Sequence, residues 1–167
     1  LSANGSLFVP GDEGDLIERL NNESIAFQEA EYIECQNSLT LALDFNKQNV
    51  GLAASLIKSV YSDFYVKKGV LEKLDTPPGR FDVIKLSDNN LAVVDYAHTP
   101  DAVEKIILGV RESFREMYII VLIGCGGNRD QSKRMAMGKT VCYNGDFAIF
   151  TSDNPRDEDP LKIIDDM

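Results

Sequence analysis

The chain has 167 residues, of which 44% are hydrophobic and 26% are charged, a balance typical of a folded globular protein rather than a disordered one. Its 27 acidic residues exceed its 17 basic residues and give a net charge of -10, which disfavours binding to nucleic acid or to an anionic membrane. The three cysteines lack Cys-x-x-Cys spacing and there is one histidine, so the sequence predicts reduced thiols in a cytoplasmic protein and no metal site. No apolar run is long enough to span a bilayer and no signal-peptide pattern is present, so we expect a soluble protein.

The first 62 residues combine short strand patterns with two helix patterns. Segments 6–11, 25–30 and 31–35 indicate short strands, and segment 15–22 indicates a helix. Segment 46–62 predicts a packed helix, because apolar residues recur there at helical spacing: Val50, Ala53, Ala54, Ile57, Val60 and Tyr61. The small residues Gly51, Ala53 and Ala54 would let a neighbouring backbone approach this helix. Residues 1–40 carry no motif that indicates chemistry.

The segment Leu-Asp-Thr-Pro-Pro-Gly-Arg, residues 74–80, is the strongest break in the pattern. Its two prolines exclude a helix, and Gly79 permits a sharp turn. We therefore expect a domain boundary here, between residues 1–79 and residues 80–167.

Beyond this boundary the pattern predicts an α/β domain. The expected elements are a hairpin of segments 80–86 and 91–96, a helix over 99–114, a strand over 118–124, a helix over 132–143 and a strand over 147–152. Thr99 is the expected N-cap of the first helix, followed by Pro100 and Asp101 at favourable positions. Apolar runs that alternate with helices predict a mainly parallel sheet with strands buried on both faces, which binds ligands at the carboxyl ends of its strands.

Segment 124–134, Gly-Cys-Gly-Gly-Asn-Arg-Asp-Gln-Ser-Lys-Arg, lies at one of these strand ends. Its glycines could let the backbone approach a ligand, and the following helix could offer N–H groups to an anion. It fails as a dinucleotide fingerprint, which would need glycine at Arg129, and Gly138–Thr140 fails as a Walker A motif because Lys133 replaces its first glycine. On the glycines alone, a plain turn with solvated bases is the favoured interpretation.

Asp95 and His98 lie three positions apart after the second hairpin strand. A turn aspartate and an ordinary surface histidine are the usual interpretation of such a pair. Their place at a strand end raises the prospect that they contact a ligand.

Arg156 follows a proline and precedes an acidic cluster in segment 152–160, Ser-Asp-Asn-Pro-Arg-Asp-Glu-Asp-Pro. It could simply pair with Asp157 or Glu158. Against this, four bases follow two successive strands of an acidic chain: Arg129, Lys133, Arg134 and Arg156. Because an arginine fork matches a carboxylate, we expect an anionic small molecule here.

Segments 93–105, 124–134 and 152–160, in this order and spacing, resemble the Mur ligase family. The resemblance covers residues 78–166, and segment 45–55 is more weakly similar to a helix start in the central domain of the family. It implies that 80–167 is a truncated, Rossmann-like C-terminal domain that binds an amino acid. Residues 1–79 would then be the C-terminal part of an α/β central domain that binds ATP.

The family resemblance implies a reaction in peptidoglycan synthesis. ATP, with Mg²⁺, would phosphorylate the D-glutamyl carboxylate of UDP-N-acetylmuramoyl-L-alanyl-D-glutamate, and the amine of meso-diaminopimelate would attack the acyl phosphate. By match to the family motifs, the nucleotide would be bound by Asn49 at adenine, Arg80 at the phosphates, Asp95 at the ribose and His98 at the phosphate region. His98 is also the candidate catalytic residue. The residues implied for meso-diaminopimelate are Arg129, Asp153, Asn154, Pro155 and Arg156, with Arg156 on the distal carboxylate.

The sequence also departs from the family. Asn128 stands where aspartate is more frequent, and the chain has neither a P-loop nor a UDP-sugar domain. We therefore expect a fragment that does not catalyse alone, is monomeric, and has small molecules as partners, without nucleic acid or membrane. Two alternatives stay open: a ligase of the folylpolyglutamate or cyanophycin synthetase type, and a non-catalytic module that binds an amino acid or nucleotide.

Overall fold

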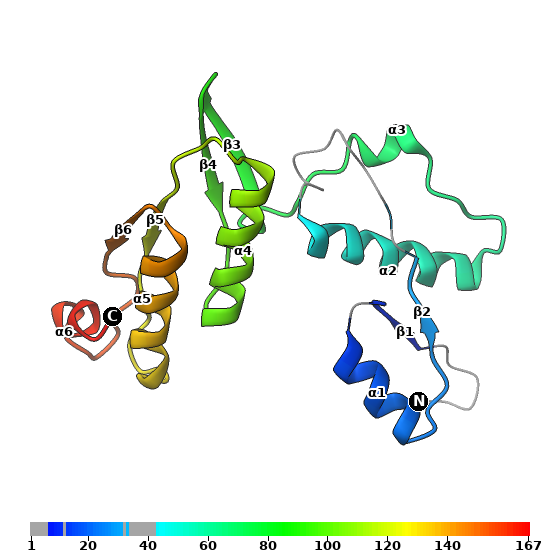
Figure 1. Cartoon of the computed structure of the whole chain (residues 1–167), viewed down its shortest axis with the longest axis horizontal. Helices are drawn as coiled ribbons and strands as arrows, with labels where there is room; N and C mark the ends of the chain where they lie inside the picture. The colour runs from blue at the N-terminus through cyan, green and yellow to red at the C-terminus, as the bar shows by residue number, and fades with distance from the viewer. Residues whose placement is uncertain (1–6, 12, 32, 34–42) are drawn as a thin grey trace. The chain divides into compact units, whose positions relative to one another are not determined.

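The computed structural model describes residues 7–11, 13–31, 33 and 43–167, and the chain divides into two compact units, Leu1–Pro77 and Pro78–Met167. The division falls between the two prolines of the predicted break. Figure 1 shows the course of the elements in each unit.

The described residues of the first unit form two short parallel strands and three helices. Strand β1 (Phe8–Val9) pairs with β2 (Gln28–Glu29), and α1 (Gly14–Asn22) connects them. Helices α2 (Asp44–Val60) and α3 (Lys68–Leu71) follow. Tyr32 and Cys35 of the third predicted strand lie outside the described residues.

Helix α2 forms where the sequence predicts it, and its buried face includes two of the small residues expected to admit a neighbouring backbone, Gly51 and Ala54. Its buried residues are Gly51, Ala54 and Ser55, and the Ser55 hydroxyl accepts a hydrogen bond of 2.9 Å from the backbone N–H of Glu31. Val60 and Tyr61 are exposed, so the apolar stripe was only partly a guide. The small residues decide the buried face because they let the chain around Glu31 approach the helix.

The second unit begins with an antiparallel hairpin, β3 (Asp82–Ser87) and β4 (Asn90–Val94). Helix α4 (Pro100–Ser113), strand β5 (Ile120–Ile123), helix α5 (Ser132–Asn144), strand β6 (Phe147–Phe150) and helix α6 (Pro160–Asp165) follow. Strands β5 and β6 are parallel, with α5 as the crossover between them, and the hairpin is paired apart from them. The chain thus has the predicted α/β fold class.

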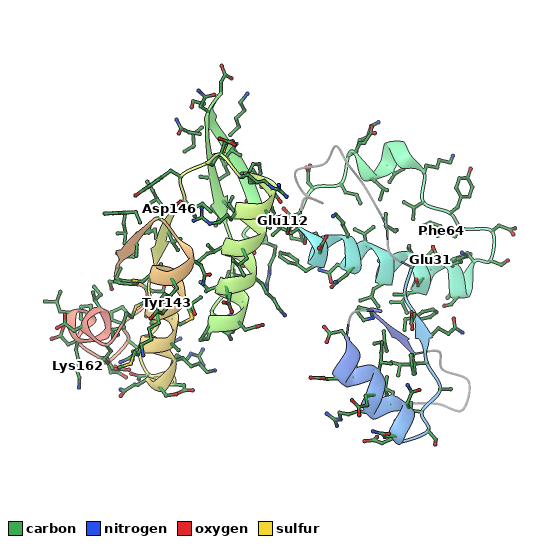
Figure 2. All side chains as sticks on the ribbon, in the orientation of Figure 1. Glu31, Phe64, Glu112, Tyr143, Asp146 and Lys162 are labelled. Atoms are coloured by element: carbon green, nitrogen blue, oxygen red, sulfur yellow. The ribbon has the colours of Figure 1, made fainter. Side chains whose placement is uncertain are left out.

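The core of the second unit lies between its helices and one face of the parallel strands. Helices α4 and α5 pack side by side and bury Val103, Ile107, Met137 and Val141 (Figure 1). Alternate strand residues pack against this cluster: Val121, Ile123, Ala148 and Phe150. Outward-facing side chains of α5 include Tyr143, which is labelled in Figure 2.

The prediction that the parallel strands are buried on both faces is wrong for the described residues. Ile120 and Leu122 are 60% and 66% exposed, and Phe147 and Ile149 of β6 are exposed beside them. Successive side chains of a strand point to opposite faces, and only one face here packs against the helix core. Among the described residues, no helix has the length and apolar character needed to cross a membrane.

Candidate functional site

The loops that follow β5 and β6 leave the sheet at the same edge. The strand register pairs Ile123 with Phe150, which are the last residues of the two strands. The backbone N–H of Gly127 then donates a hydrogen bond of 2.8 Å to the carbonyl of Asn154. Parallel pairing therefore brings together two sequence motifs that are nearly thirty residues apart.

Two glycines allow this close contact between the loops. A Cβ atom at Gly124 would lie 2.6 Å from the carbonyl oxygen of Thr151, and one at Gly127 would lie 1.8 Å from that of Pro155. Neither distance is possible for a side chain. These glycines therefore serve the packing of one loop on the other, a role that the sequence interpretation did not distinguish from ligand approach.

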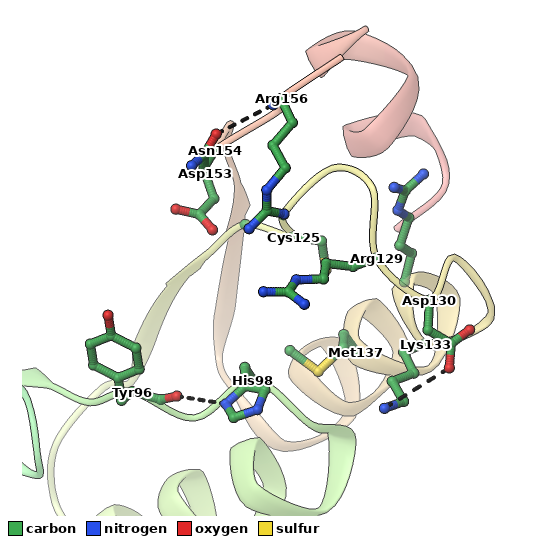
Figure 3. A pocket seen from close by; sticks show the side chains of 13 residues that line it. Tyr96, His98, Cys125, Arg129, Asp130, Lys133, Met137, Asp153, Asn154 and Arg156 are labelled. Carbon is green, nitrogen blue, oxygen red and sulfur yellow. Dashed lines mark hydrogen bonds and ion pairs between the residues drawn. The ribbon is translucent and has the colours of Figure 1, made fainter. Parts of the chain in front are cut away.

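A cavity of about 780 Å³ lies between the two loops, the start of α4 and helix α5 (Figure 3). Its lining residues are Tyr96, His98, Gly124, Cys125, Gly126, Arg129, Asp130, Lys133, Arg134, Met137, Asp153, Asn154 and Arg156. Five of the predicted site residues are among them: His98, Arg129, Asp153, Asn154 and Arg156.

Arg129 and Arg156 come from different loops and reach into this cavity together (Figure 3). Both side chains lie against Gly126, where a Cβ atom would be 3.3 Å from Nη1 of Arg156 and 3.8 Å from Cγ of Arg129. Arg156 also donates a hydrogen bond to the carbonyl of Gly127. Two guanidinium groups in one cavity are suited to a ligand that carries carboxylates.

The alternative that Arg156 merely pairs with its acidic neighbours does not hold. Asp157 accepts a hydrogen bond from the side chain of Asn128, and Glu158 pairs with Arg134. Among the described residues, no carboxylate lies within 4.0 Å of the guanidinium nitrogens of Arg129 or Arg156. Both guanidinium groups therefore keep their charge available to a ligand.

The other two bases of the predicted cluster, Lys133 and Arg134, each lie within 4.0 Å of a carboxylate of the chain. Arg134 donates to Glu158 and Asp166 at 2.8 Å each and has only 2% of its side chain exposed. Lys133 lies 3.9 Å from Asp130. The four predicted bases therefore do line one cavity, and Arg129 and Arg156 are the two of them that have no ion-pair partner among the described residues.

The start of α5 is also occupied by a group of the chain itself. One carboxylate oxygen of Asp130 accepts hydrogen bonds from the backbone N–H and the hydroxyl of Ser132, at 3.0 and 2.6 Å. These bonds hold the pKa of Asp130 below its ordinary value. An external anion, which the sequence predicts at this helix start, would have to compete with the Asp130 carboxylate for the N–H group of Ser132.

An acidic group and an imidazole line the same cavity as the arginines. Asp153 contributes a carboxylate to the cavity wall, and His98 lies near the start of α4 (Figure 3). Nδ1 of His98 is 3.1 Å from the carbonyl oxygen of Tyr96. In the neutral ring this contact assigns the proton to Nδ1 and leaves Nε2 as the acceptor. The cavity thus offers groups of both signs, as a zwitterionic amino acid requires.

Asp95, Arg80 and Pro155 do not line the cavity. The two oxygens of Asp95 accept hydrogen bonds from the N–H groups of Phe81 and Ala97, at 2.8 and 2.7 Å. The guanidinium of Arg80 lies 5.3 Å from the ring centre of Tyr96. Asn49 belongs to the first unit, where it is exposed on α2.

Sequence reasoning missed four lining residues: Tyr96, Cys125, Asp130 and Met137. Three of them stand inside motifs already noticed, so position within a motif was the available signal. Met137 gave no such signal, because it reads as an ordinary core residue of a helix. Burial raises the pKa of the Cys125 thiol, so this group stays protonated near neutral pH.

The described residues offer no ligand set for a metal ion, since no three His, Cys, Asp or Glu side chains there are placed to hold one. Mg²⁺ that binds together with a nucleotide usually takes one or two carboxylates and the substrate phosphates rather than a set of three side chains.

Comparison with known proteins identifies relatives of this chain by sequence and by fold. A family model described as "Mur ligase, glutamate ligase domain" matches residues 79–167. The UDP-N-acetylmuramoyl-L-alanyl-D-glutamate–2,6-diaminopimelate ligase of Aquifex aeolicus is 39% identical over 173 residues, covering 98% of this chain and 34% of that protein. The ligase of the same name from Alkaliphilus oremlandii is 48% identical over 95 residues, covering 57% of this chain and 19% of that protein.

A solved structure of a protein with the same name matches the fold. It has a TM-score of 0.52 and 28% sequence identity, and the match covers 97% of this chain and 39% of that one. The chain spans about a third of the length of the Aquifex aeolicus relative.

Proposed function

The chain belongs to the Mur ligase family, whose members are ATP-dependent ligases, and on this premise we propose that it forms part of an enzyme that adds meso-diaminopimelate to UDP-N-acetylmuramoyl-L-alanyl-D-glutamate. The observation that carries the proposal is that two guanidinium groups, Arg129 and Arg156, line one cavity without an ion-pair partner among the described residues. The names of the relatives favour this substrate over the folylpolyglutamate and cyanophycin alternatives.

The cavity residues divide the binding of the amino acid between them. meso-Diaminopimelate carries a carboxylate and an ammonium at each end, whereas the far end of lysine has only an ammonium. Arg129 and Arg156 would bind the distal carboxylate bidentately, and Asp153 with Asn154 would bind the ammonium beside it. This arrangement leaves the other end of the ligand to react.

In the proposed reaction, ATP phosphorylates the glutamyl carboxylate, and the free amine of meso-diaminopimelate attacks the acyl phosphate and expels phosphate. The amine must lose a proton as the amide forms. His98 is the candidate catalytic residue for this role, because Nε2 is its acceptor when Nδ1 donates to Tyr96. The role of the two arginines is to hold the amine in place for attack.

Apart from His98, the nucleotide part of the proposal uses residues outside the cavity. Asn49 would contact adenine, Arg80 the phosphates and Asp95 the ribose, with His98 near the phosphates. Arg80 is suited to bind phosphate, because stacking on the ring of Tyr96 holds its guanidinium group in place and leaves its positive charge intact. Asp95 would have to bind ribose while its oxygens accept the N–H groups of Phe81 and Ala97. ATP and Mg²⁺ are the cofactors of this proposal.

The remaining parts of the proposal concern the whole protein. We propose that residues 1–79 belong to its ATP-binding domain and residues 80–167 to its amino-acid-binding domain. It would act in the cytoplasm as a monomer, with only small molecules as partners.

The test of the proposal is calorimetric titration of the 167-residue chain with meso-diaminopimelate and with lysine. We expect tighter binding of meso-diaminopimelate, since each charge-assisted hydrogen bond contributes about 1.5–3 kcal/mol. Arg156→Ala should remove this preference. Arg115→Ala is the matched control, because it removes an exposed arginine that does not line the cavity and should leave the preference intact. Equal affinities of the wild-type chain for the two amino acids would refute the proposal.

A further inference from the structure

Glu158 joins the two loops that carry the cavity arginines. Its Oε1 accepts a hydrogen bond from the backbone N–H of Asn128, and its Oε2 accepts one of 3.2 Å from the side chain of Gln131. Nη2 of Arg134 lies 2.9 and 2.8 Å from the two oxygens. One carboxylate on the loop after β6 therefore receives donors from the loop after β5 and from helix α5.

Arg134, which donates to both carboxylate oxygens of Glu158, is itself held in place. Arg134 is buried on α5, and its other terminal nitrogen, Nη1, donates to Asp166 at 2.8 Å. The bonds from Asn128 and Arg134 lower the pKa of Glu158, which shows that they favour its charged form. A buried arginine with two partners has little freedom to move, so Glu158 is tied to the rigid part of the domain.

The hydrogen bond between Asn128 and Glu158 joins residues that are close in sequence to the two cavity arginines. Asn128 immediately precedes Arg129, and Glu158 follows Arg156 by two residues. Asn128 and Arg156 both have left-handed backbone conformations, with φ of 53° and 49°. Such conformations are costly for residues other than glycine and persist only where surrounding contacts hold them. The backbone N–H of Glu158 supplies one such contact, a bond of 3.0 Å to Pro155 that closes the turn around Arg156.

We propose that Glu158, anchored by Arg134, is the positioning residue that keeps Arg129 and Arg156 at the spacing needed to share one distal carboxylate. The inference rests on the proposed function and extends it to residues that touch no substrate. It assigns to the acidic cluster after Arg156 a role in substrate specificity, through the geometry of the two arginines. The effect should be specific for meso-diaminopimelate, because lysine has no distal carboxylate to be shared.

The test compares Glu158→Gln with Asp166→Asn in the 167-residue chain. Each variant removes one carboxylate from Arg134, but only Glu158 also contacts the loop after β5. We expect Glu158→Gln to weaken binding of meso-diaminopimelate by roughly tenfold while binding of lysine changes little. Asp166→Asn should lower the melting temperature and weaken binding of meso-diaminopimelate much less than Glu158→Gln does, because Glu158 still accepts from Arg134 and from Asn128. Equal effects of the two variants on affinity, or no effect of Glu158→Gln, would overturn the inference.

A readout without ligand separates this inference from the proposed function. Hydrogen exchange at the backbone amide of Asn128 should be faster in Glu158→Gln than in the wild-type chain, and unchanged in Asp166→Asn. If the wild-type chain binds neither amino acid, the proposed function fails, and the exchange rates still decide whether Glu158 holds the loop. Should Glu158→Gln not fold, Glu158→Asp serves instead. It keeps the charge but is too short to reach Asn128 and Arg134 together, and it should give the same pattern.

Discussion

At Gly127 the loop after β5 passes so close to Pro155 that a single methyl group has no space. The obstacle is a backbone carbonyl, which cannot turn aside as a long side chain can. Gly126 differs, because the nearest atom to its missing Cβ is the end of the Arg156 side chain, at 3.3 Å. The two neighbouring glycines thus have different roles. Gly127 lets the two loops pack, and Gly126 lies beside the Arg156 side chain, which lines the cavity.

The contrast between these glycines predicts different losses of stability. Gly127→Ala should lower the free energy of unfolding by about 1–3 kcal/mol, because the backbones of two loops must separate. Gly126→Ala should cost much less, since the Arg156 side chain can shift. Thermal unfolding of both variants, followed by circular dichroism, measures the difference. Equal melting temperatures for the two variants would contradict the packing role assigned to Gly127.

The start of helix α4 lies directly after His98 and is well defined by local chemistry. The Thr99 hydroxyl accepts a hydrogen bond of 3.3 Å from the backbone N–H of Ala102, and Pro100 occupies the first turn. Asp101 adds a negative charge near the helix start and lies 3.3 Å from Lys105, one turn later. These contacts fix the point at which the chain leaves His98 and enters the core.

Loss of the helix cap should therefore destabilise the unit. We expect Thr99→Ala to lower the free energy of unfolding by about 1 kcal/mol, because the N–H of Ala102 loses its acceptor. Thr99→Ser keeps the hydroxyl and should remain close to the wild-type chain. Urea denaturation of the three proteins gives the comparison, and a full loss in Thr99→Ser would point to the methyl group rather than the cap.

Asp146 and Glu158 of the second unit both have pKa values below their ordinary values. They belong to a chain with a net charge of -10. The pKa of Asp146 is lowered by the backbone N–H of Ile119 and by Arg111, and that of Glu158 by Asn128 and Arg134. Both carboxylates bind protons less readily in the folded chain than in the unfolded one. Their stabilising effect is therefore fully present above their ordinary pKa values of 3.8 and 4.5.

Stability of the second unit should accordingly decrease as the pH falls below the ordinary pKa of Glu158, 4.5, because the unfolded chain then takes up protons that the folded chain excludes. Melting temperatures measured between neutral and acidic pH test this. The difference between the wild-type chain and Glu158→Gln should be largest at neutral pH and should shrink in acid. A difference that stays constant with pH would show that the charge of Glu158 does not contribute.

The elements of the second unit were predictable because their signals are local. A cap followed by proline starts α4, a turn between alternating strands gives the hairpin, and apolar runs give β5 and β6. The first unit was less predictable, because α2 buries small residues and exposes Val60 and Tyr61. Which face of a helix is buried depends on what packs against it, and hydrophobicity alone does not specify that neighbour.

By itself, the sequence determined the α/β class, the family and the two loops where a ligand site should lie, since these follow from short-range patterns and motif spacing. Only the tertiary structure decided which of four basic residues remain available. Arg134 is removed from the set by Glu158 and Asp166, which are 24 and 32 residues away in sequence. Those partners meet it because parallel pairing of β5 with β6 fixes where the second loop returns. Charge neutralisation depends on distance in space, and strand register sets that distance.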